Sequence, residues 1–151
     1  MDDTKINRYF KGGKIKLNFA LDGAKIRILI EHCQDLPTIS NTAPEPYVKT
    51  YLLDAAKSKI SNSKVRNWFF LLFAPILKHI KKQKKTPTSH RTCHPTFNHV
   101  IEYHHVELEQ VSYIDISVWS YFISGNVALG RFLLELDKKH LRGWFPLESI
   151  T

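Results

Sequence analysis

The chain has 151 residues, of which 43% are hydrophobic and 24% charged, and it carries a formal net charge of +8. This length and composition predict one globular domain that can bury a core without disulfides or a structural metal. Two cysteines form no disulfide framework, and the acidic start Met1-Asp2-Asp3 is unlike a signal peptide, so we expect an intracellular protein or a fragment of one.

The positive charge is concentrated in one stretch. Residues 57–91 contain ten basic residues and no acidic one, whereas the rest of the chain is slightly acidic. Such a local excess indicates an anionic partner: a membrane containing phosphoinositide or phosphatidylserine, nucleic acid, or an acidic protein.

A hairpin is predicted after a leader at residues 1–11. Residues 14–20 and 25–33 both alternate apolar and polar side chains, and the Asp22-Gly23 pair between them is a strong hairpin signal. Residues 34–45 are rich in Pro, Ser, Thr and Asn and are therefore expected to form a loop.

The next predicted strand, Pro46–Leu53, has alternating β-branched and aromatic residues. Pro46 stands at its first position, where a missing N–H group is tolerated. We expect Val48, Thr50 and Leu52 to face the core, and Tyr47, Lys49 and Tyr51 to face outward.

A different segment follows at 62–80. It contains the apolar run Trp68-Phe69-Phe70-Leu71-Leu72-Phe73, is interrupted by Pro75, and is too short to span a bilayer. Four later strands are predicted at 97–104, 111–119, 127–136 and 144–147. Short strands at this spacing, joined by turns, predict an all-β antiparallel sandwich.

Eight short motifs occur in the order found in one known family. They are Gly13-Lys14-Ile15-Lys16-Leu17, Cys33-Gln34-Asp35-Leu36-Pro37, Pro46–Leu53, Lys84-Lys85-Thr86, Arg91-Thr92 with Pro95-Thr96-Phe97-Asn98, Ile116-Ser117-Val118-Trp119, Leu129-Gly130, and Gly143-Trp144-Phe145-Pro146-Leu147. The chain thus resembles a C2 domain of synaptotagmin-like topology. Its sequence motifs are most similar to those of C2 domains of class II phosphoinositide 3-kinases, synaptotagmin-like proteins and presynaptic scaffolds. The resemblance implies an eight-stranded antiparallel β-sandwich over 12–149, with binding loops at one end.

The resemblance also implies that 62–80 is an insertion, because removing it restores the family spacing. Three interpretations stay open. The segment is an apolar or amphipathic helix that binds a membrane or a partner, a helix folded back onto the sandwich, or a splice or gene-model artefact.

Calcium-dependent members of this family hold the ion with several aspartates from two loops, in agreement with the six to eight oxygen ligands that Ca²⁺ prefers. The matching positions here are Ser40, Glu45, Ser120, Phe122, and Asn126 or Val127. One glutamate cannot build such a site, so we expect no metal and no cofactor. The apolar residues Tyr121, Phe122 and Ile123 are a candidate membrane-inserting loop, the alternative being an ordinary connection.

In the resembling family, a Tyr-x-Lys strand and lysines of the following strand bind phosphoinositide headgroups. The matching residues are Tyr47, Lys49 and Lys85, with Lys84 beside them and Lys81, Lys82 and Arg91 widening the basic field. Pro87 stands where relatives often have a further lysine. The alternative is a basic edge that is merely solvated.

We therefore expect a calcium-independent C2-type module that brings a larger signalling or vesicle-trafficking protein to an anionic phospholipid membrane, as a cytoplasmic, peripheral protein. The alternative is a protein-interaction module without lipid binding. No catalytic motif is present, so we expect no enzyme. Nucleic acid is not expected, because no interleaved stacking array accompanies the lysines. The histidines at 90–105, with Cys93, have no zinc-site spacing.

Overall fold

The computed structural model describes residues 12–60, 83–137 and 139–149. The predicted leader, the predicted insertion and the site candidates Lys81 and Lys82 lie outside these residues, and those predictions stay predictions. Within the described ranges, no helix has the length and apolar character needed to cross a membrane.

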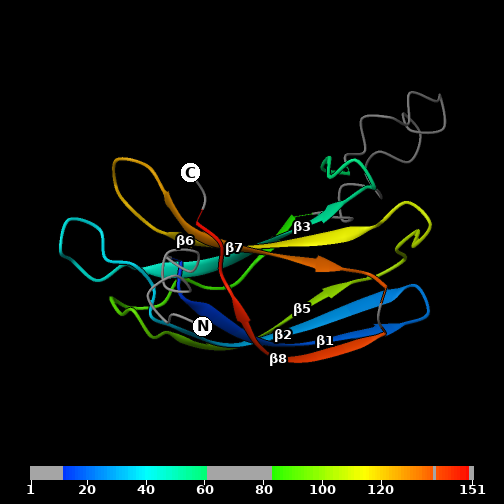
Figure 1. Cartoon of the computed structure of the whole chain (residues 1–151), viewed down its shortest axis with the longest axis horizontal. Helices are drawn as coiled ribbons and strands as arrows, with labels where there is room; N and C mark the ends of the chain where they lie inside the picture. The colour runs from blue at the N-terminus through cyan, green and yellow to red at the C-terminus, as the bar shows by residue number, and fades with distance from the viewer. Residues whose placement is uncertain (1–11, 61–82, 138, 150–151) are drawn as a thin grey trace, which may run out of the picture.

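The described part of the chain contains eight strands. They are β1 (Lys14–Asp22), β2 (Lys25–Gln34), β3 (Pro46–Leu53), β4 (Gln83–Lys85), β5 (Thr96–Tyr103), β6 (Tyr113–Ser120), β7 (Val127–Glu135) and β8 (His140–Pro146). They form two four-stranded antiparallel sheets, ordered β5-β2-β1-β8 and β4-β3-β6-β7 (Figure 1). The predicted all-β, eight-stranded antiparallel sandwich is confirmed.

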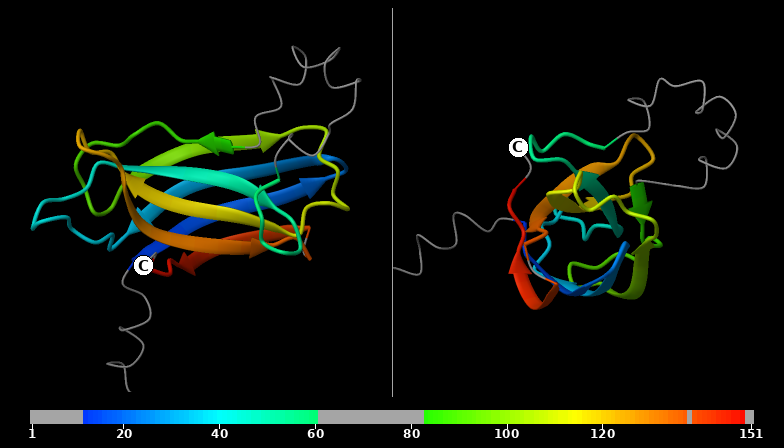
Figure 2. Two further views of the ribbon diagram at one scale, coloured as in Figure 1. Left: turned by 90° about the horizontal axis from the view of Figure 1, so that it is seen from above. Right: turned by 90° about the vertical axis from the view of Figure 1, so that its right-hand side faces the viewer.

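Alternation along the strands explains why the sheets face one another across an apolar core. Every second residue of the hairpin strands and of β3 and β6 is fully or almost fully buried, as in Ile15, Leu17 and Phe19 of β1. The right-hand view of Figure 2 runs along the strands and shows the two sheets as layers on either side of this core. The intervening residues point outward and supply the two outer faces of the molecule.

One strand begins earlier than the sequence predicts. We expected the last strand at 144–147, whereas β8 starts at His140, whose partner on β1 is Ala20. β8 is an edge strand of its sheet. The exposed side chains of His140 and Arg142 make its first half polar, although its backbone pairs with β1 throughout. The polar side chains of the first half of β8 are therefore the reason that the sequence did not predict this part of the strand.

Hydrogen bonds between Tyr103 and Thr50 join the two sheets inside the core. The Tyr103 hydroxyl, on β5, shares its proton between Thr50 Oγ1 at 2.6 Å and the Thr50 carbonyl oxygen at 3.1 Å. Thr50 Oγ1 in turn donates to the carbonyl oxygen of Lys84 at 3.2 Å. Burial raises the pKa of Tyr103 to about 12, so the phenol remains a donor at neutral pH. These bonds connect β5 with β3 and with the short strand β4.

We expect Tyr103→Phe to lower the free energy of unfolding by about 1–2 kcal/mol, because it removes a buried hydrogen bond and leaves the aromatic packing intact. Urea unfolding, with an unchanged m value, measures this loss. The matched control is Tyr113→Phe, since the Tyr113 hydroxyl makes no hydrogen bond to the described residues. Equal stability of the two variants would contradict a role for the Tyr103 hydroxyl.

Candidate functional site

The outer face of β3 carries the predicted anion-binding residues. β3 lies between β4 and β6, so its outward side chains have neighbours on both sides. Val48, Thr50 and Leu52 are buried as predicted, and Lys49 points outward, partly exposed. Tyr47 also lies outside the core cluster, yet only 4% of it is exposed. Trp119 on β6 is the direct partner of Tyr47, and Lys49 Nζ lies 5.7 Å from the centroid of the Tyr47 ring. These two neighbours cover Tyr47.

Lys49 and Lys85 are directly opposite each other in the β3–β4 ladder. Burial, followed by the charges of Lys85 and Lys59, holds the pKa of Lys49 below its usual value. Like charges in directly opposite positions of an antiparallel pair destabilise the folded state. Within the described residues, neither lysine forms an ion pair with an acidic side chain.

Aromatic rings surround Lys49 in place of a carboxylate. Its Nζ lies 4.4 Å from the Trp119 ring centroid, a distance typical of a cation–π contact. Trp119 is half-buried, and its indole N–H donates to Ser117 Oγ at 2.9 Å, which fixes the ring on the sheet. Trp119 is not among the predicted site residues. Only the β3–β6 register, which pairs it with Tyr47, brings it beside Lys49.

Lys84 does not join this face. It pairs with Thr50, so alternation turns it toward the inner side of the sheet edge, where its Nζ lies 5.3 Å from the Tyr103 ring centroid. Beyond β4, Thr86 still bonds to Val48: its N–H donates to the Val48 carbonyl oxygen and its Oγ1 accepts from the Val48 N–H, both at 2.9 Å. Pro87 follows only after these bonds, so it leaves the Lys49–Lys85 pairing intact.

Arg91 lies at the loop end of the sandwich, away from the Lys49–Lys85 pair. Loops 35–45, 86–95 and 121–126 come together at this end (Figure 1). They form an open cavity of about 340 Å³ lined by Glu45, Arg91 and the predicted loop residues Tyr121, Phe122 and Ile123, among others. The exposed fractions of these three apolar side chains are 50%, 44% and 96%. The structure thus groups Arg91 with the candidate inserting loop.

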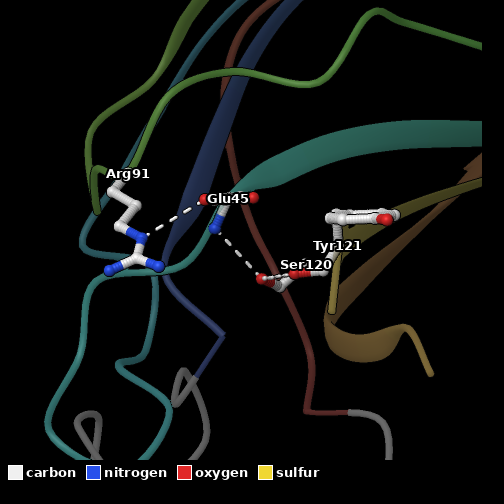
Figure 3. A network of polar contacts seen from close by, with 4 residues as sticks. All are labelled: Glu45, Arg91, Ser120 and Tyr121. Atoms are coloured by element: carbon white, nitrogen blue, oxygen red, sulfur yellow. Dashed lines mark hydrogen bonds and ion pairs between the residues drawn. The ribbon is translucent and has the colours of Figure 1, made fainter. Parts of the chain in front are cut away.

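The same cavity contains most of the positions that matched calcium ligands. Ser40, Glu45, Ser120 and Phe122 all line it, and Glu45 is the one carboxylate among the lining residues. Arg91 Nε donates to Glu45 Oε1 at 3.2 Å (Figure 3), so an arginine already occupies this carboxylate. Among the described residues, no three acidic, histidine or cysteine side chains gather as a metal site. These residues do not fit a calcium ion.

Comparison with known proteins identifies the family. The model of the C2 domain matches residues 24–69 and 71–147. The chain belongs to the C2 domain family. C2 domains commonly bind phospholipid membranes or proteins and are typically non-catalytic.

Similar proteins support the predicted resemblance to lipid-kinase and presynaptic C2 domains. The chain is 28% identical over 148 residues to the phosphatidylinositol 4-phosphate 3-kinase C2 domain-containing subunit alpha of Pongo abelii. It is 27% identical over 149 residues to the corresponding subunit beta of Homo sapiens. These matches cover 93% and 91% of this chain but only 7% and 8% of the relatives. A C2 domain of RIM from Drosophila shares the fold, with a TM-score of 0.65 at 17% identity, covering 90% of this chain and 98% of that domain.

We expect Lys85→Gln to keep or slightly raise the stability of the fold. Because the pKa of Lys49 is lowered in the folded chain, its protonation costs the folded state free energy at pH values below that pKa. The cost falls as the pH rises above the folded-state pKa and is gone above the unfolded-state pKa. Removing the Lys85 charge relieves part of the cost at neutral pH, by about 0.2–1 kcal/mol. Urea unfolding measures the change. Lys139→Gln, at an exposed turn, is the control, and a clear loss of stability in Lys85→Gln would contradict the repulsion.

Proposed function

We propose that this chain is a calcium-independent membrane-binding module whose β4-β3-β6 face takes an anionic phospholipid headgroup, a phosphoinositide foremost. The observation that carries the proposal is the Lys49–Lys85 pair, two facing cations without an ion-pair partner among the described acidic side chains. A headgroup phosphate between them supplies the missing counter-charge and favours protonated Lys49.

The surroundings of the pair suit a lipid headgroup. Trp119 borders Lys49 with a half-buried ring, and amphipathic rings of this kind favour the membrane interface. Each basic residue near an anionic leaflet contributes about 1 kcal/mol, so two or three of them bind weakly and in a salt-sensitive manner. The exposed loop Tyr121–Phe122–Ile123 begins two residues after Trp119 and supplies a second, apolar anchor.

The proposed role is to bring a larger protein to the cytoplasmic surface of a membrane. The curated relatives are named as phosphatidylinositol 4-phosphate 3-kinase subunits, and this chain spans less than a tenth of their length. We therefore assign it targeting in signalling or vesicle trafficking, without catalysis of its own. Calcium plays no part, because Glu45 is the one carboxylate at the loop-end cavity and is held by Arg91.

A protein-interaction module is the second candidate function, and one observation favours it. Trp144, on the outer face of the other sheet, is 39% exposed. Lys14 Nζ lies 5.1 Å from its ring centroid and the His32 ring stacks on it at 6.5 Å. An exposed aromatic ring with a lysine beside it is typical of protein interfaces. Capture of a protein partner that is lost in Trp144→Ala but kept in Lys49→Gln/Lys85→Gln would support this function.

Co-sedimentation with phosphatidylcholine vesicles, with and without phosphatidylserine and a phosphoinositide, tests the membrane proposal. We expect Lys49→Gln/Lys85→Gln to weaken binding to anionic vesicles by about 30-fold, from about 1 kcal/mol per lysine. Added salt should weaken binding of the native chain, and a calcium chelator should leave it unchanged.

The matched control is Lys139→Gln/Arg142→Gln, which removes two exposed charges from the side of the other sheet. It should weaken binding far less than the Lys49/Lys85 variant. Binding that requires calcium, or that ignores both salt and the Lys49/Lys85 substitutions, would exclude the proposed mechanism.

A further inference from the structure

We propose that the outer edge of β8 binds an extended acidic segment of a partner protein, which adds to the β5-β2-β1-β8 sheet as a further strand. The inference goes beyond the membrane proposal. It rests on the second candidate function, protein interaction through Trp144, and it states the class of partner and the way in which that partner binds.

β8 is the last strand of its sheet. Within the described residues its ladder partner is β1 alone, so its other side has no neighbouring strand (Figure 1). The backbone N–H and C=O groups on such a side are a ready template for pairing with another chain. Addition of a peptide strand to a sheet edge is a common mode of peptide recognition, in which main-chain hydrogen bonds supply affinity and alternate side chains supply specificity.

Two hydrogen bonds show which backbone groups of β8 face this edge. The Leu147 N–H donates to the Gly13 carbonyl oxygen, and the Leu21 N–H donates to the Lys139 carbonyl oxygen, both at 2.8 Å. In an antiparallel pair, residues alternate between bonding to the partner strand and pointing away from it. The odd-numbered residues of β8 therefore bond to β1, and the backbone groups of its even-numbered residues point to the edge.

The edge-facing residues are thus His140, Arg142 and Trp144, followed by Pro146. Pro146 agrees with this alternation, because a residue without an N–H group loses no ladder bond at an edge-facing position. The side chains of these residues are exposed, on the outer face of the sheet. Each of the first three therefore offers its backbone to an added strand and its side chain to the directly opposite residue of that strand.

The charge of this edge selects an acidic partner. Arg142, and Lys14 and Lys139 near it, form no ion pair with an acidic side chain of the described residues. An acidic residue opposite Arg142 in an antiparallel pair stabilises the pairing. Trp144 is 39% exposed, and Lys14 Nζ lies 5.1 Å from its ring centroid. The ring is an anchor of the kind that dominates the energy of protein interfaces.

The inner side of the same edge suits apolar side chains. Leu141 and Phe145 are partly buried against the core, and the Phe145 ring stacks on Phe132 of β7 at 4.7 Å. Between them, apart from its chain neighbours, Gly143 has no described atom within 4 Å of the position that a Cβ would take. An added strand thus meets basic and aromatic groups on one face and apolar groups with open space on the other. The matching segment alternates acidic and apolar residues.

The same charges disfavour a second copy of this chain as the occupant. Antiparallel pairing of two β8 edges would bring the Arg142 side chains of both copies together, and like charges in opposite positions destabilise a pair. Basic residues and proline on an edge strand protect against pairing of identical edges in this way. An acidic strand meets no such repulsion.

Fluorescence anisotropy with a labelled peptide, Glu-Val-Glu-Ile-Glu-Val-Glu, tests the proposal on the full chain. We expect the native chain to bind it, and Arg142→Glu to weaken binding about tenfold, because an attractive cross-strand pair becomes a repulsive one. Trp144→Ala should weaken binding by a similar factor. The matched control is Lys49→Gln/Lys85→Gln, which changes the net charge by the same two units on the other sheet and should bind within about twofold of the native chain. Thermal unfolding identifies any variant that is not folded.

Methylation of the peptide nitrogens tests whether the backbone pairs. The glutamates lie opposite the edge-facing residues, so their N–H groups donate to β8, and N-methylation of the central glutamates should weaken binding at least about tenfold. The N–H groups of the valines and isoleucine point away, and their methylation should change binding by less than about twofold. Equal binding of the two methylated peptides would show attraction by charge alone and would overturn the added strand.

The outcomes separate this inference from the proposed functions. If the peptide does not bind at up to about 1 mM, the added strand is wrong, whereas the vesicle assay still decides the membrane proposal. If the peptide binds as expected and vesicles do not, the edge site stands and the membrane proposal is wrong. If sedimentation shows that the native chain is a dimer that Trp144→Ala dissociates, the edge belongs to a second copy and the acidic partner is wrong.

Discussion

Lys49 on β3 and Lys85 on β4 lie directly opposite each other, so the folded structure has to accommodate the repulsion between two like charges. The alternation of β3 requires Val48, Thr50 and Leu52 in the core, and a one-residue slip would bury Lys49. Register therefore holds Lys49 opposite Lys85, and burial together with the charge of Lys85 holds the pKa of Lys49 below its usual value. The rings of Tyr47 and Trp119 offset part of the cost of this repulsion. Among the described residues no carboxylate pairs with these two lysines, which is why we propose that an anion binds between them.

The loop end differs from the sheet face, because its basic side chain is paired with a carboxylate. There Arg91 has a carboxylate partner, Glu45, at a position that the family resemblance matched to a calcium-binding aspartate. The ion pair engages one oxygen of the one carboxylate that lines the cavity and orients the guanidinium beside exposed apolar residues. The sheet face therefore offers charge, whereas the loop end offers charge together with apolar surface. A bilayer presents both chemistries at adjoining depths.

Features that depend on local alternation could be predicted from the sequence. The core row of β3, the hairpin of β1 and β2, and the outward position of Lys49 all follow from a period of two, and the family motifs located the loops. Features that depend on register between distant strands could not: Lys84 turns inward because it pairs with Thr50, and Trp119 joins the site because it pairs with Tyr47. The Arg91–Glu45 contact joins residues 46 positions apart through loop conformations that no sequence period encodes.

The most direct measurement is the side-chain pKa of Lys49, followed by NMR in the free chain and with a short-chain phosphoinositide. We expect a value below that of ordinary lysine in the free chain, because of burial and Lys85, and a rise on binding, because a phosphate favours the charged ammonium. Lys139, at an exposed turn, is the control lysine, and its side-chain NMR signals should not respond to the lipid. If the lipid binds while the pKa of Lys49 is unchanged, the headgroup does not lie between Lys49 and Lys85, and the central claim is wrong.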